Sequence, residues 1–240
     1  MQKLFVDFIP ENKITLDGEQ ARHIARSLRM KKGDMLTLTC GDGQDRGCII
    51  EDIDSTTVTL SVCYTQASNS EPSVKVRLFQ SVPKGDKLED IVQKCTELGI
   101  SEICPVLTDR SISRPDEKSA AKKQARYQKI ALESAQQSGR GIIPKICKMT
   151  SLENAVRADD SELKILFYEG GGEPLGKMID KNIKSVSIYI GPEGGFDKKE
   201  VELLESAGAR VATLGKRILR TQTAPVAALT AIMLLTGNLE

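Results

Sequence analysis

The chain has 240 residues, of which 40% are hydrophobic, 28% charged and 4% aromatic, and its formal net charge is +1. A chain of this length and composition can bury a large apolar core in one or two domains, and it is unlike a disordered or fibrous protein. A net charge so close to zero gives no general attraction to nucleic acid, so any nucleic-acid site must be a local patch.

Signals for export, membranes and metals are missing from the sequence. The opening MQKLFVDFIPENK resembles neither a signal peptide nor a transit peptide, and the most apolar stretch, 224–235, is too short to cross a bilayer. There is one histidine, and none of the six cysteines has a neighbour at the spacing of a zinc knuckle. We therefore expect a cytoplasmic protein with reduced cysteines, no metal and no membrane contact.

The first 70 residues predict a small β-rich domain. Short strands are expected in KLFVDFI, KITL, DMLTLTC, GCIIEDI and TVTLSVCY, with a polar helix-like stretch after KITL. The segment 65–73, TQASNSEPS, is polar and lacks periodicity, so it is the expected linker. We place one domain at residues 1–70 and a second at residues 74–240.

From residue 74 onward, strands and helices alternate. After the strand VRLFQSV, apolar residues recur at helical spacing from 88 to 98, and Gly99 is the expected C-cap. There follow the strand ICPVL, a charged helix over 118–137, the strands LKILF, VSIYI and ARVAT, a helix from Asp197, and an apolar helix over 224–235. This alternation predicts an α/β domain with a largely parallel sheet that is covered on both faces.

Glycine-bearing loops follow three of these strands. YEGGGEP follows LKILF, GPEGGF follows VSIYI, and LGKRILRTQTAP follows ARVAT. Asp197 with Glu200 has the pattern of a capping box, and Thr223 with Pro225 has that of a helix cap and first turn. A tight turn without a ligand explains one GxxGG loop equally well, but three loops at strand ends predict a ligand crevice. Neither a Walker lysine nor GxGxxG is present, which disfavours ATP and NAD.

At this point the sequence carries a resemblance to a known family. GPEGGF together with LGKRILRTQTA resembles the signature of the SPOUT methyltransferases, specifically the ribosomal RNA small subunit methyltransferase E family, which methylates N3 of a uridine in 16S ribosomal RNA. KGDKLEDIVQKCTELGI, Arg110 with Ser111, AQQSGR, and His23 with LRMKKGD extend the resemblance over nearly the whole chain.

The resemblance implies a fold, a cofactor and partners. The fold would be a PUA-like N-terminal β-barrel that binds RNA and a C-terminal α/β domain with a trefoil knot, a rare exception to the rule against threaded chains. The cofactor would be S-adenosyl-L-methionine. The partners would be small-subunit ribosomal RNA or the assembled small subunit, and a second copy of the chain in a homodimer.

The resemblance also places the cofactor against the three loops, whose backbone groups and apolar side chains suit an adenine and a ribose. A place in the hydrophobic core is the alternative for the apolar residues. The residues assigned to the cofactor are Phe167, Tyr168, Glu169, Gly191, Pro192, Glu193, Gly194, Gly195, Leu214, Gly215, Ile218, Leu219 and Arg220.

Three residues are candidates for the chemistry, which requires uridine N3 to lose its proton. Arg220 would stabilise the anion that develops on the base, with a phosphate contact or a helix-end salt bridge as alternatives. Glu193 would accept the proton if its pKa were raised. Gln222 stands where the family usually has glutamate, and Gln136 where it often does, and glutamine cannot act as a base. The alternative function is therefore a catalytically weak or inactive RNA-binding protein.

Basic residues near the N-terminus predict the RNA-binding surface. Three arginines recur at i, i+4 and i+7, which is one face of a helix, and clustered cations favour phosphate contacts. A solvated surface helix gives the same pattern. The residues predicted to bind RNA are Arg22, His23, Arg26, Arg29 and Lys32, and a second basic stripe consists of Lys118, Lys122, Arg126 and Lys129.

Overall fold

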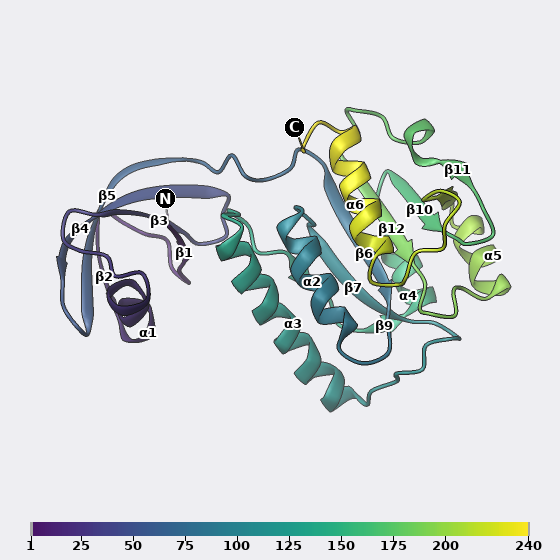
Figure 1. The fold of residues 1–240 in the computed structure, drawn as a ribbon, viewed down its shortest axis with the longest axis horizontal. Coiled ribbons are helices and arrows are strands. Elements are labelled where there is room, and N and C mark those ends of the chain that lie inside the picture. Colours follow the sequence, from purple (N-terminus) through teal and green to yellow (C-terminus); the bar gives the residue numbers. More distant parts are fainter. Residues whose placement is uncertain (1, 240) are drawn as a thin grey trace. The chain divides into compact units, whose positions relative to one another are not determined.

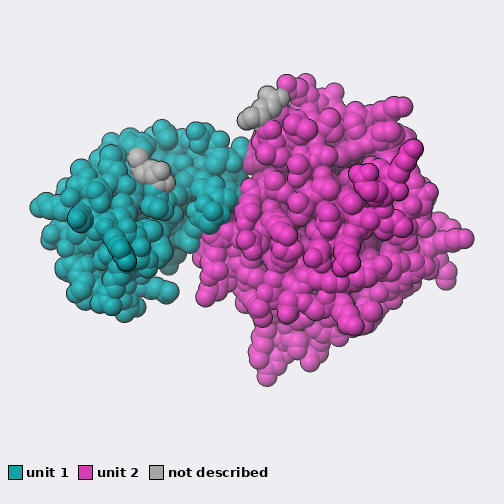
Figure 2. All heavy atoms as spheres, viewed as in Figure 1, with its two compact units in different colours: residues 1–71, 135–143 teal, residues 72–134, 144–240 magenta. Residues whose placement is uncertain are grey.

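The computed structural model describes residues 2–239 and divides into two compact units (Figure 1). The first unit comprises the chain up to Glu71 together with residues 135–143, and the second comprises residues 72–134 and 144–240 (Figure 2). The chain therefore leaves the first unit after Glu71 and returns to it once. The returning segment, 135–143, was expected within the second domain.

The first unit is built around a five-stranded sheet. Its elements are β1 (Lys3–Phe5), β2 (Lys13–Asp17), α1 (Gly18–Arg22), the π-helical turn η1 (His23–Ser27), β3 (Met35–Thr39), β4 (Gln44–Ile53) and β5 (Thr57–Ala67). The strand order is β1-β3-β4-β5-β2, with β1 and β3 parallel and the other pairs antiparallel. Strand alternation turns Ile14 and Leu16 of β2 inward, where they join an apolar cluster with Ile24, Leu36 and Leu60.

Strand β5 runs into the segment that was expected to be a linker. Residues 65–67 pair with residues 44–46 of β4, so the linker does not begin at residue 65. The physical reason is that backbone pairing with a neighbouring strand does not depend on the polarity of the side chains.

The carboxylate of Glu71 holds the returning segment in the first unit. It accepts hydrogen bonds from Arg140 Nη2 (2.6 Å) and from the amides of Gly141 (2.8 Å) and Ile142 (3.1 Å). Thr39 Oγ1 in turn donates to the carbonyl of Gly141 (3.3 Å). These contacts join residues far apart in the sequence, and hydrophobic periodicity has no signal for them.

The second unit contains a parallel sheet. Its elements are β6 (Lys75–Ser81), α2 (Lys87–Glu97), β7 (Glu102–Leu107), α3 (Glu117–Gln137, whose last residues belong to the first unit), β8 (Lys145–Ile146), β9 (Thr150–Ser151), α4 (Leu152–Ala158), β10 (Leu163–Phe167), β11 (Glu173–Pro174), the 3-10 turn η2 (Leu175–Lys177), β12 (Ser185–Ile190), α5 (Lys198–Ser206), β13 (Arg210–Thr213) and α6 (Ala224–Leu235). The strand order is β11-β13-β10-β12-β6-β7-β8, and β9 also pairs with β7. Every pair in this sheet is parallel, which confirms the α/β prediction.

Helices cover both faces of this sheet. On one face, Phe79, Leu166 and Tyr189 pack in an apolar cluster with residues of α4 and α5, and the rings of Phe79 and Tyr189 stack with centroids 4.6 Å apart. Leu78 and Ile188 alternate to the other face. There α6 contacts β6 and β12 and lies beside α2 (Figure 1). Within residues 2–239, no helix is both long and apolar enough to span a membrane.

The starts of the last two helices follow the sequence signals closely. Asp197 and Glu200 form a reciprocal capping box at the start of α5, as predicted. Helix α6 begins at Ala224 with Pro225 in its first turn. Thr223 occupies the N-cap position, but its side chain makes no capping hydrogen bond because its backbone is helical (φ −88°, ψ −36°).

Candidate functional site

A cavity of about 390 Å³ lies at the carboxyl ends of β10, β12 and β13. These strands are neighbours in the order β13-β10-β12, so the loops that follow them meet at one edge of the sheet. The volume lies within the range of small-molecule sites, about 300–1,000 Å³. The three glycine-bearing loops therefore converge as the sequence predicted.

The structure brings together at this cavity nearly all of the residues predicted for the cofactor. The predicted residues that line it are Phe167, Tyr168, Glu169, Gly191, Pro192, Glu193, Gly195, Leu214, Gly215, Ile218, Leu219 and Arg220. Gly194, which was predicted for the cofactor, and Gln222, a candidate for the chemistry, do not line it. The carbonyl of Gly194 accepts a hydrogen bond from Arg110 (2.6 Å), and Gln222 is half-buried outside the lining.

Several residues of the cavity were missed by the sequence analysis. They are Lys87, Ile190, Phe196, Ala212, Thr213, Lys216, Arg217, Thr221 and Ala224. Lys87 begins α2, far from the three loops in sequence, and its place in KGDKLEDIVQKCTELGI, a segment that shares the family resemblance, was the available signal. Lys216, Arg217 and Thr221 lie inside the motif LGKRILRTQTA, and their position between predicted residues was the available signal.

Two glycines allow the loop after β12 to fold tightly beside the side chain of Glu169. Gly195 has φ of +67°, and a Cβ at this position would lie 2.6 Å from Oε2 of Glu169. A Cβ on Gly191 would lie 3.2 Å from the Cα of Gly195. A side chain at position 195 would be strained by the positive φ and would displace the carboxylate of Glu169, whereas one at position 191 would press on the backbone at Gly195.

A buried hydrogen-bond chain fixes the third loop to the second. The hydroxyl of Thr221 donates to the carbonyl of Gly191 (2.9 Å) and accepts from Nε2 of Gln80 (3.1 Å). Gln80 lies on β6 and is 0% exposed. The wall of the cavity therefore depends on a residue that does not itself line it.

Glu193 is held as an anion by the start of α2. Its carboxylate accepts hydrogen bonds from Nζ of Lys87 and from the amide of Lys84 (3.2 Å). Burial acts to raise the pKa of Glu193, but these hydrogen bonds outweigh it and hold the pKa below its usual value. The raised pKa that a proton acceptor needs is therefore not found at Glu193.

Cations gather around the cavity although the chain as a whole is nearly neutral. Lys216, Arg217 and Arg220 line the cavity and are exposed. Among the described residues, the side chain of Arg220 forms no ion pair, whereas Lys87 is paired with Glu193. The helix-end salt bridge considered for Arg220 is thus not seen within residues 2–239, and its guanidinium is free to meet an anion.

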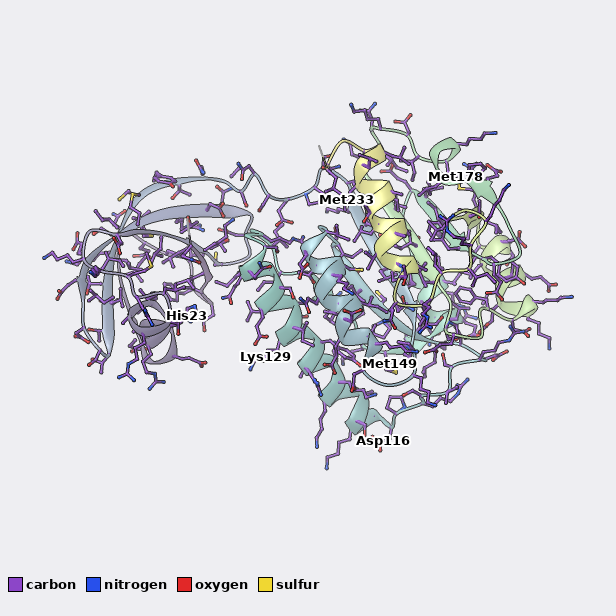
Figure 3. All side chains as sticks on the ribbon, in the orientation of Figure 1. His23, Asp116, Lys129, Met149, Met178 and Met233 are labelled. Atoms are coloured by element: carbon purple, nitrogen blue, oxygen red, sulfur yellow. The ribbon has the colours of Figure 1, made fainter. Side chains whose placement is uncertain are left out.

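The basic residues predicted to bind RNA lie in the first unit, and all are exposed. Arg22 ends α1. The next residue, His23, begins η1 and is labelled in Figure 3. The expectation that three arginines share one helical face was wrong, because the helical stretch ends at Ser27 and Arg29 has a left-handed backbone (φ 54°). Lys32 follows in the next turn.

Comparison with known proteins assigns the chain to a family. Residues 69–233 match the model of an RNA methyltransferase domain, and residues 16–63 match that of an RNA methyltransferase PUA domain. The ribosomal RNA small subunit methyltransferase E of Bacillus subtilis is 34% identical, with 97% of this chain and 96% of that protein covered. The chain belongs to the ribosomal RNA small subunit methyltransferase E family.

Two solved structures connect the family fold with a cofactor. A ribosomal RNA small subunit methyltransferase E from Neisseria gonorrhoeae, bound to S-adenosyl methionine, has a TM-score of 0.88 with 29% identity and 98% of each chain covered. A methyltransferase from Legionella pneumophila, in complex with the same cofactor, has a TM-score of 0.85 with 29% identity and 97% of each chain covered. The family membership confirms the resemblance drawn from GPEGGF and LGKRILRTQTA.

Proposed function

We propose that this chain uses S-adenosyl-L-methionine to methylate N3 of a specific uridine in 16S ribosomal RNA. The observation that carries the proposal is the cavity at the ends of β10, β12 and β13, because the loops that form it contain both family motifs. Relatives named for the modification of small-subunit ribosomal RNA, and relatives bound to the cofactor, support it.

The residues of the cavity fit the cofactor. Gly191 and Gly195 let the loop after β12 fold tightly beside Glu169, so that its backbone amides and carbonyls can face an adenine and a ribose. Glu169 is exposed at the cavity and suits a ribose hydroxyl, and Phe167, Leu219 and Ile218 supply apolar walls. When bound, S-adenosylmethionine supplies an electrophilic methyl group on a sulfonium.

The chain's own contribution to the chemistry is electrostatic. A uridine becomes nucleophilic at N3 when it loses its proton, and nearby cations lower the pKa of such a group. Arg220 lines the cavity without an ion pair among the described residues, so its guanidinium donors would stabilise the anionic base. Glu193 forms an ion pair with Lys87, so we assign it a role in shaping the site. The proton of uridine N3 would then be accepted by solvent.

The first unit would hold the RNA and would close into a PUA-like barrel. Its five strands surround a common apolar cluster, and the exposed cations at 22, 23, 26, 29 and 32 would contact phosphates. The second basic stripe is a weaker candidate, because Arg126 pairs with Glu89 and Lys129 with Glu133.

The trefoil knot and the homodimer also belong to the proposal. Residues 214–223 connect β13 with α6. Strand β13 lies on one side of β10, whereas α6 contacts β12 and β6, which lie on its other side. Within this connection, Thr221 is hydrogen-bonded to the loop after β12. Such a crossing is what a knotted chain end requires. On α6, Leu234 is 57% exposed and Leu235 is 38% exposed, and a second copy of the chain would cover these apolar side chains in the homodimer. The proposed location of the protein is the cytoplasm.

The test is to incubate the purified protein with radiolabelled S-adenosylmethionine and small ribosomal subunits from cells that lack this activity. The RNA is then digested and the labelled nucleoside identified, with free 16S ribosomal RNA as a parallel substrate. We expect labelled 3-methyluridine. Cofactor binding without label on either substrate would instead support the catalytically inactive RNA-binding protein. The position of Gln222 outside the cavity favours activity, because no base is removed from the lining.

A further inference from the structure

Two thiols meet on the parallel sheet, outside the cavity. Strands β7 and β8 pair with Ile103 opposite Ile146, so the next residues, Cys104 and Cys147, are neighbours. Their Sγ atoms are 2.8 Å apart, and the amide of Cys147 donates to the carbonyl of Ile103 (2.9 Å). The two cysteines are 43 positions apart in the sequence, so cysteine spacing gave no sign of the pair.

Glu102 orders the two thiols. The thiol of Cys104 donates to Sγ of Cys147, whose thiol donates to Oε1 of Glu102 (2.9 Å). The carboxylate of Glu102 also pairs with Arg77 (2.6 Å) and Lys145 (2.9 Å). Within residues 2–239, Glu102, Cys104 and Cys147 form the one group of side chains that could surround a metal ion. A dication would have to compete with two cations already on Glu102, which disfavours metal binding.

The strand geometry suits a covalent bond between the sulfurs. Neighbouring strands lie about 4.8 Å apart, within the range of about 4.4–6.8 Å over which disulfides join Cα atoms. The two thiols also differ in access. Cys104 is 5% exposed, whereas Cys147 is half-buried and can be reached by a small molecule. Reactive pairs commonly combine one accessible thiol with one that resolves the intermediate.

We propose that Cys104 and Cys147 form a modification site at which a low-molecular-weight disulfide, such as oxidised glutathione, generates an intramolecular disulfide. The sulfur of Cys147, as its thiolate, attacks one sulfur of the oxidant, forming a mixed disulfide and releasing one thiol. The sulfur of Cys104 then attacks the Cys147 sulfur and releases the second thiol. The two cysteines lose two electrons and two protons, which reduce the oxidant's disulfide bond to two thiols.

The bond would close a loop that contains α3 and the returning segment 135–143. Cys147 follows this segment closely, so the disulfide would fix β7 to the point at which the chain re-enters the second unit. Closing a loop of this length restricts the unfolded chain, so we expect the oxidised protein to unfold at a temperature several degrees higher than the reduced protein. This site is independent of the proposed methyl transfer.

The test uses the full chain in buffers of graded ratio of oxidised to reduced glutathione. After free thiols are blocked and the protein is digested with trypsin, we expect the peptide 95–110 to be linked to the peptide 146–148. The linked protein should lose the mass of two hydrogens. Fragment spectra distinguish Cys104 from Cys95, which lies in the same peptide but is buried in α2. Glutathione adducts on the wild-type protein without the linked peptides would overturn the proposal.

Two variants separate the roles of the thiols. Cys104→Ser should trap glutathione on Cys147, whereas Cys147→Ser should leave Cys104 unmodified. Cys63→Ser, which removes an exposed cysteine of β5, is the matched control and should leave the linkage unchanged. A Cys104→Ser protein whose Cys147 stays unmodified would contradict the order of attack. The series of glutathione ratios with the wild-type protein tests whether the disulfide forms, and this test does not depend on whether a variant folds.

Discussion

The hydroxyl of Thr221 donates a hydrogen bond of 2.9 Å to the carbonyl of Gly191, 30 positions earlier in the chain. This bond joins the two loops that contain the family motifs. Thr221 lies between Arg220 and Gln222, two of the three residues that the sequence indicated for catalysis. The geometry instead gives the central structural role to the residue between them, because it is also bonded to Gln80 on β6.

Thr221→Val should weaken cofactor binding. The substitution leaves the carbonyl of Gly191 and the amide of Gln80 without their shared partner, at a cost of about 2 kcal/mol. We expect S-adenosylmethionine to bind roughly tenfold or more weakly in titration calorimetry, because about 1.4 kcal/mol corresponds to tenfold. Thr221→Ser keeps the hydroxyl and should bind nearly as the wild type does. Equal affinity in all three proteins would mean that the hydroxyl of Thr221 does not support the cavity that binds the cofactor.

Gly195→Ala should impair the same site for a different reason. The positive φ of Gly195 strains any L-residue by about 1 kcal/mol, and the new Cβ would meet the carboxylate of Glu169. We expect reduced cofactor affinity with little change in thermal stability of the whole protein. Gly176→Ala is the control, because nothing lies within 4 Å of its Cβ position. If both variants bind the cofactor equally well, the loop is more adaptable than its geometry indicates.

The sequence predicts the five strands of the first unit and the main strands and helices of the second, because periodicity and caps are local signals. The apolar helix over 224–235 and the capping box at Asp197 match the structure, since both depend on neighbouring residues. The return of residues 135–143 to the first unit depends on contacts with Glu71, and the position of Lys87 at the cavity depends on the packing of α2. Contacts between distant residues have no periodic pattern, so they required the structure.

Gln222→Glu tests whether a base is missing from this chain. Gln222 does not line the cavity, so a carboxylate there should change the rate of methyl transfer by no more than about twofold, which is under 0.5 kcal/mol in the barrier. The measurement is the rate against pH for both proteins with saturating cofactor and RNA. A rate at least tenfold higher in Gln222→Glu, with a new acidic limb in its pH–rate profile, would indicate that a carboxylate at position 222 acts as the base.

Charge reversal in the first unit should weaken RNA binding without affecting the cofactor. Arg22→Glu combined with Arg26→Glu removes two exposed cations. We expect the salt dependence of RNA affinity to become shallower by roughly one unit of slope for each phosphate that the variant no longer neutralises. Affinity is measured by filter binding at several salt concentrations. Lys118→Glu with Lys122→Glu on α3 is the matched control, and a larger loss of affinity in that protein would move the RNA surface to α3.

Asp159→Asn should lower stability at neutral pH, and this loss should shrink as the pH falls below about 4. The Asp159 carboxylate, whose side chain is 0% exposed, accepts hydrogen bonds from Ser187 and Tyr189 (2.7 Å) and pairs with Arg77 (3.2 Å). Burial acts to raise the pKa of Asp159, but these hydrogen bonds outweigh it and hold the pKa below its usual value.

A carboxylate whose pKa is lower in the folded than in the unfolded protein stabilises the fold above the unfolded pKa, about 3.9, and this contribution disappears as the pH falls through the folded pKa. Urea unfolding at pH 7 should therefore show a loss of about 2 kcal/mol in Asp159→Asn, the scale of a charged hydrogen bond. The difference should shrink as the pH falls from about 4 toward 2. Tyr189→Phe removes one donor and should show a smaller loss with the same pH trend. A difference that stays constant across this range would mean that packing, and not the ionised carboxylate, makes Asp159 important.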